Sequence, residues 1–115
     1  GAYKQDFQVG DKSYTYEISG NILYGYVGTK IGFDSDWLQR AAGIAQIKDH
    51  IGKDPDKIGP SNTYYDEPHD NAAIRVGIEL SQNYGDKLTR SQFIETTNKY
   101  NADLNVQNPG WFPMR

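Results

Sequence analysis

A single proline restricts the fold of this chain more than any other feature, because it fixes where a long helix can begin. Pro68 stands ahead of a run in which apolar residues recur at helical spacing, and Gly85 follows the run. The core-facing positions of that run are Ala73, Ile74, Gly77 and Ile78. Proline suits the first turn of a helix, where its missing N–H would have no partner. We therefore predict a helix from about Pro68 to Tyr84, with Gly85 as its stop and an apolar face that must be buried.

The N-terminal segment predicts a different element. Residues 3–18 alternate between apolar and polar positions around the turn Gly10-Asp11-Lys12, which is typical of a β-hairpin. The side chains expected on its apolar face are Phe7, Val9, Tyr14, Tyr16 and Ile18. A lone hairpin is only marginally stable in water, so this face should pack on helices.

Three further helices are expected. Asn21 can cap a helix that runs to about Ile31 and stops at Gly32, and Asp34 or Ser35 can cap a second one. Thr89 and Gln92 have the spacing of a capping box for the last helix. Together these elements predict a mainly helical α+β fold, an N-terminal hairpin on about four helices, in one domain spanning residues 1–115.

Small residues inside these helices predict close packing. Gly25 and Gly28 each weaken the first helix by up to about 1 kcal/mol relative to alanine, which suggests that another backbone or a ligand approaches there. The second helix carries a matching small surface at Ala41-Ala42-Gly43, so the two surfaces are expected to meet. The aromatic tail at residues 108–113 is expected to dock on the body.

Composition excludes several kinds of site. The chain has no cysteine, which rules out disulfides, thiolate metal sites and cysteine nucleophiles. Its net charge of −3 and scattered basic residues weigh against a nucleic-acid substrate. No apolar run is long enough for a membrane span, and nothing resembles a signal peptide.

The segment Asp66-Glu67-Pro68-His69-Asp70 is the strongest candidate for chemistry. It follows a turn-rich stretch from about His50 to Tyr65, and long ordered loops are often functional. Acidic residues also stabilise helix starts, so capping alone explains part of the pattern. Asp66 and Asp70 could instead divide acid and base roles, or Asp70 could work with Glu17. A hard cation on Asp66, Glu67 and Asp70 is the alternative, although we expect neither a metal nor a cofactor.

Other chemistries have less support. His69 could act as a base in RNA cleavage, with Arg75 or Lys30 handling the phosphate. Tyrosine rings suit sugars and bases alike, which makes Tyr24 and Tyr65 candidates for substrate contact.

The order of these motifs resembles a known family. The run from Asn21 to Phe33 contains N-x-x-Y-G-x-x-G, Ala42-Gly43 and Gln46 form A-G-x-x-Q, and the acidic segment reads D-[DE]-P-x-D before I-x-x-G. Over about residues 21–80 the chain resembles the bacterial polymorphic toxin type 44 domain. The resemblance makes Asn21, Tyr24, Gln46, Asp66 and Asp70 the best site candidates, whereas His69 falls at a variable position of the pattern.

The resemblance also implies a biological setting. Such a domain is a toxin module at the C-terminal end of a larger secreted protein, delivered into a competing bacterium and neutralised by a cognate immunity protein. We assign Asp66 and Asp70 as catalytic, and Asn21, Tyr24, Gln46, Tyr65 and His69 as substrate-binding. The favoured activity is hydrolysis of peptidoglycan glycan strands in the periplasm of the target cell. A cytoplasmic ribonuclease is the first alternative, and a non-catalytic interaction module is the second.

Overall fold

The computed structural model describes residues 7–50, 52–53, 58–64 and 66–105. The chain begins with strands β1 (Phe7–Val9) and β2 (Lys12–Tyr14), which pair in antiparallel register with Phe7 opposite Tyr14. Helices α1 (Glu17–Lys30), α2 (Ser35–His50) and α3 (Pro68–Tyr84) follow, with the short 3₁₀ helix η2 (Ser61–Thr63) before α3. A second 3₁₀ helix, η3 (Gly85–Lys87), leads into α4 (Arg90–Lys99) and α5 (Asn101–Leu104). The predicted class, a mainly helical fold with an N-terminal hairpin, is confirmed.

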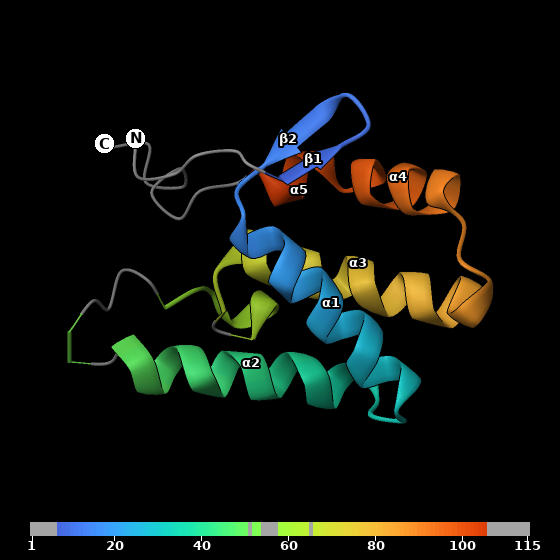
Figure 1. Ribbon diagram of the computed structural model, residues 1–115. Helices are drawn as coiled ribbons and strands as arrows, with labels where there is room; N and C mark the ends of the chain where they lie inside the picture. The colour runs from blue at the N-terminus through green and yellow to red at the C-terminus, as the bar shows by residue number, and fades with distance from the viewer. Residues whose placement is uncertain (1–6, 51, 54–57, 65, 106–115) are drawn as a thin grey trace.

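Helix α3 is the centre of the fold. Figure 1 shows α1 lying across α3, with α2 on one side of this pair and the hairpin, α4 and α5 on the other. Its predicted bounds are confirmed, with Pro68 as its first residue and Gly85 at its C-terminal end. The main core cluster joins it to the hairpin, α1 and α5, and a smaller cluster of Leu38, Ile74 and Ile78 joins it to α2. The apolar pattern after Pro68 therefore sets the architecture.

Glycines allow α1 and α3 to touch at their backbones. A Cβ atom on Gly25 would lie 2.1 Å from the carbonyl oxygen of Ile74, and one on Gly77 would lie 2.0 Å from that of Ile22. The close contact predicted for Gly25 is confirmed, but its partner is α3. Gly28 does face α2, through the side chain of Leu38, whereas Gly43 of α2 faces the carbonyl of Tyr64. The expected meeting of the small surfaces of α1 and α2 is wrong, because α3 and the segment before it occupy those places.

The start of α1 differs from the prediction. The second strand ends at Tyr14, α1 begins at Glu17, and Tyr16 is 70% exposed, so neither Tyr16 nor Ile18 extends the apolar face of the hairpin. Ile18 and Ile22, four residues apart, are both buried on the core side of α1, and this helical period overrides the short alternation. Asn21 consequently lies inside α1 and does not cap it.

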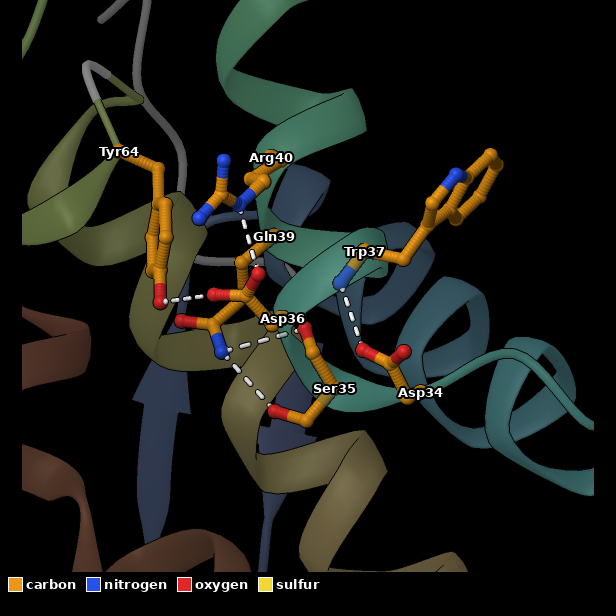
Figure 2. A network of polar contacts seen from close by, with 7 residues as sticks. All are labelled: Asp34, Ser35, Asp36, Trp37, Gln39, Arg40 and Tyr64. Atoms are coloured by element: carbon orange, nitrogen blue, oxygen red, sulfur yellow. Dashed lines mark hydrogen bonds and ion pairs between the residues drawn. The ribbon is translucent and has the colours of Figure 1, made fainter.

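The remaining helix ends follow their local chemistry. The Asp34 side chain accepts a hydrogen bond from the Trp37 N–H at the start of α2 (2.9 Å; Figure 2). Thr89 and Gln92 form the predicted capping box of α4. The short helix α5 was not predicted, and α2 continues to His50. The tail at residues 108–113 lies outside the described residues.

The Asn98 side chain of α4 makes two hydrogen bonds to the hairpin. Asn98 donates from Nδ2 to the Val9 carbonyl (3.0 Å) and accepts from the Tyr14 hydroxyl (2.5 Å). The rings of Phe7 and Phe93 meet edge to face beside it. The hairpin therefore packs on helices, as expected for strands that are marginal alone.

Candidate functional site

A pocket of about 360 Å³ opens between α1, α2 and the start of α3. Its walls carry five side chains that the sequence singles out and one acid that it does not. The lining residues are Asn21, Tyr24, Ala41, Ala42, Ala45, Gln46, Asp49, Asp66 and Asp70. The alanines of α2 leave the space open, so this small-residue stretch forms a pocket wall in addition to a packing surface.

The segment before α3 is held by close backbone contacts. The Thr63 hydroxyl donates to the Asp66 carbonyl (2.8 Å), and the Asp66 N–H donates to the Thr63 carbonyl (3.0 Å). A Cβ on Gly59 would lie 1.7 Å from the Asp66 carbonyl oxygen, and one on Gly43 would lie 1.7 Å from that of Tyr64. The two glycines let the chain fold over itself and rest on α2, which fixes the direction of Asp66.

Tyr64 also links the segment before α3 to α2. Its backbone is left-handed, with φ of 57°, an uncommon conformation for a residue with a side chain. Its hydroxyl donates a hydrogen bond to Asp36 of α2 (2.8 Å). Asp36 also accepts a hydrogen bond from Arg40 Nε (Figure 2). Strained backbone persists only where surrounding contacts hold it, and such positions gather at functional sites.

Asp66 is almost completely buried, with 4% of the residue exposed. Its Oδ1 accepts the backbone N–H of Glu67 at 3.0 Å. Burial raises the pKa of Asp66 from 3.8 to about 6, opposed by the hydrogen bond from Glu67 and aided by the charge of the Glu67 carboxylate. At neutral pH this side chain is therefore mainly a carboxylate that gains a proton just below neutrality.

Asp70 is held more firmly in the neutral form. Asn21 donates from Nδ2 to its Oδ1 at 3.0 Å, so the residue expected to cap α1 instead positions a carboxyl group. Burial, together with the charges of Asp66, Glu67 and Glu17, raises the pKa of Asp70 from 3.8 to about 8. Two neighbouring carboxyl groups with separated pKa values are the arrangement that divides acid and base roles.

The other predicted residues lie around this pair in different ways. The Tyr24 hydroxyl donates to the Leu38 carbonyl (2.8 Å), and Tyr24 also lines the pocket. Gln46 donates from Nε2 to Glu67 (3.4 Å) and links α2 to the acidic segment. Tyr65 lies outside the described residues. Asp49 was missed, although its spacing of three and four residues from Gln46 and Ala45 places it on the same face of α2.

His69 is not among the residues that line the pocket, and its side chain lies beside Glu17 of α1. It is 7% exposed, and its Nε2 lies 3.5 Å from Asp70 Oδ1 and 3.8 Å from Glu17 Oε2. These three groups form the one set among the described residues whose donor atoms, all within 4.8 Å of one another, could share a cation. The set differs from the predicted Asp66, Glu67 and Asp70. Acidic groups commonly lie this close without an ion, so we assign no metal.

The cations considered for a ribonuclease lie elsewhere. Lys30 pairs with Asp86 at the far end of α1, and Arg75 lines a different pocket. Among the described residues that line the carboxylate pocket, none is a lysine or an arginine. No described helix is both long and apolar enough to cross a membrane.

Comparison with known proteins gives one match. Neither the curated proteins nor the solved structures contain a significant match to this chain. The family model for bacterial toxin 44 matches residues 3–83, a span that includes every described residue lining the carboxylate pocket. Because this span is well over half of the chain, the chain belongs to the bacterial toxin 44 family.

Proposed function

We propose that this toxin domain hydrolyses the glycan strands of peptidoglycan in a target bacterium, with Asp66 and Asp70 as its catalytic pair. The observation that carries the proposal is a pair of carboxyl groups that line one pocket, with Asp66 buried and 15% of the Asp70 side chain exposed. Glycosidases cleave with two such groups on either side of the scissile bond. Membership of a bacterial toxin family supports an action on a target cell, which we propose is a competing bacterium.

The electrostatics of the pair support distinct roles. Near pH 7 Asp70 is mainly protonated and Asp66 mainly ionised, since their pKa values are about 8 and about 6. Asp70 then donates its proton to the glycosidic oxygen as the C–O bond breaks. Asp66 accepts a proton from a water molecule, and the hydroxyl that remains bonds to the anomeric carbon to form the new reducing end.

The pocket walls favour a sugar over a phosphodiester. Tyr24 presents an aromatic surface, and Asn21, Gln46 and Asp49 present the polar groups that hydroxyls bind. Phosphoryl chemistry needs cations at the phosphate, and the described lining carries only acidic and neutral side chains. A carboxylate-lined pocket would repel RNA.

Delivery and protection complete the proposal. The domain acts in the periplasm of the target cell, carried there as the C-terminal module of a larger secreted protein by the delivery protein of a secretion system. A cognate immunity protein protects the producing cell by covering the carboxylate pocket.

Expression in bacteria with and without a periplasmic export signal tests this function. We compare the wild type with Asp66→Asn, Asp70→Asn and a control, Asp11→Asn, which changes an exposed acid in the hairpin turn. We expect lysis only after export, lost in both pocket variants and kept in the control. Growth arrest without export, together with degraded RNA, would instead indicate the ribonuclease. Absence of toxicity in both compartments would indicate a binding module.

A further inference from the structure

A second pocket, of about 540 Å³, lies on the other side of the segment that carries Asp66. It opens between α2, η2, α3 and α5, and none of its lining residues belongs to the carboxylate pocket. Its walls are mainly polar, with Gln39, Tyr64 and Asn71 beside Arg75 and Asp103. A polar pocket with a cation can bind an anion if the cation is positioned and has free donors.

Arg75 is positioned by a chain of buried amides. Its Nε donates to Asn71 Oδ1 (2.9 Å), and Asn71 Nδ2 donates to Gln39 Oε1 (3.0 Å). Gln39 Nε2 in turn donates to the Ser35 hydroxyl (3.0 Å), as Figure 2 shows. Asn71 is 1% exposed and Gln39 is 8% exposed. Each amide is oriented by the next, so the Arg75 side chain is fixed before any ligand arrives.

The terminal nitrogens of the Arg75 guanidinium remain available as hydrogen-bond donors. A guanidinium has five N–H groups, and only the one on Nε is used in the amide chain. Its terminal nitrogens make no hydrogen bond or ion pair within residues 7–50, 52–53, 58–64 and 66–105. Its central carbon lies 5.6 Å from the centre of the Tyr100 ring, which holds the plane from one face. Four N–H groups remain, and two of them, one on each terminal nitrogen, are parallel and form the fork that matches a carboxylate.

We propose that this pocket binds a carboxylate of the substrate through the terminal nitrogens of Arg75, as a specificity site beside the carboxylate pocket. The identity of the ligand rests on the proposed function, since peptidoglycan carries carboxylates on the peptides attached to its glycan strands. One fixed guanidinium suits one planar carboxylate. Asp103 on the same wall opposes a ligand with many charges, such as RNA, and therefore favours the peptide carboxylate.

The test measures binding without turnover. Muramyl dipeptide, which has one free carboxylate, is titrated into ¹⁵N-labelled protein while the side-chain signals of Asn71, Gln39 and Arg75 are followed by NMR. We expect these signals to shift, and the dissociation constant to rise about 10- to 100-fold in Arg75→Gln. Arg75→Lys should lie between, because it keeps the charge and loses the fork. Arg90→Gln, on the exposed start of α4, is the control and should bind normally.

Four further measurements make the result decisive. The carboxamide form of the same fragment should not bind, and Asp103→Asn should tighten binding by removing a like charge. Equal binding of the carboxamide, or normal binding by folded Arg75→Lys, would overturn the proposal. Inorganic phosphate that binds more tightly than the fragment would overturn it in favour of a phosphate ligand. Repeating the titration in Asp70→Asn separates the two proposals, because this binding needs no catalysis.

Discussion

The acid Asp70 should make the domain less stable as the pH rises, and Asp70→Asn should reverse this. The folded-state pKa is about 8 and the ordinary value is 3.8. Between these pH values the folded state holds a proton that the unfolded state has released, so the free energy of unfolding falls with increasing pH. Since one pKa unit corresponds to about 1.4 kcal/mol, ionisable Asp70 costs about 1.7 kcal/mol at pH 5 and about 5 kcal/mol at pH 8.

Asparagine removes the titration and keeps the shape. Its side-chain oxygen can still accept the hydrogen bond from Asn21 Nδ2 that Asp70 Oδ1 accepts. The stability of Asp70→Asn relative to the wild type should therefore grow by about 3.5 kcal/mol from pH 5 to pH 8. Urea unfolding at intervals across this range measures the difference.

The comparison has a clear control and a clear failure. Asp11→Asn, which alters an exposed acid in the hairpin turn, is the control for replacing an aspartate outside the pocket. A constant difference between Asp70→Asn and the wild type would show that Asp70 ionises normally in the folded protein. The division of roles between Asp66 and Asp70 would then lose its electrostatic basis.

Three structural predictions accompany this one. Gly77→Ala should lower the free energy of unfolding by several kcal/mol in urea, because its Cβ would lie 2.0 Å from the Ile22 carbonyl oxygen. Gly20→Ala is the control, since Gly20 has open space around it in α1, and it should be neutral or stabilise by up to about 1 kcal/mol. Equal effects would contradict the close approach of α1 and α3. Gly59→Ala should displace the Asp66 segment and abolish toxicity while the circular dichroism spectrum stays helical, and retained toxicity would refute the role of that close contact. Asn98→Ala should speed hydrogen exchange in the hairpin and leave α3 protected, since it removes two hydrogen bonds between the hairpin and α4; uniform exchange would contradict this.

Local rules in the sequence account for much of the fold. Pro68 and Gly85 mark both ends of α3, and Thr89 with Gln92 marks the start of α4, because these signals act within one helical turn. The start of α1 was misplaced because Ile18 suits both a strand alternation and a helical face. Only burial against α3 decides between the two, and that contact is not local.

In the candidate site too, local motifs were predictable and long-range contacts were not. Motif order led to Asn21, Tyr24, Gln46, Asp66 and Asp70, which the structure brings together around one pocket. Their contacts were not predictable, because they join residues far apart in the chain. The hydrogen bond from Asn21 to Asp70 spans 49 positions, and the chain of amides behind Arg75 crosses from α2 to α3. Such pairings depend on how the helices pack.

The release of new reducing ends from purified peptidoglycan, measured as a function of pH, tests the central claim most directly. If Asp66 acts as a carboxylate and Asp70 as an acid, activity should rise near pH 6, peak near neutrality and fall near pH 8. Asp66→Asn and Asp70→Asn should each lose about 10²- to 10⁴-fold in rate, and Asp11→Asn should match the wild type. No new reducing ends at any pH, or full activity in both pocket variants, would contradict the account.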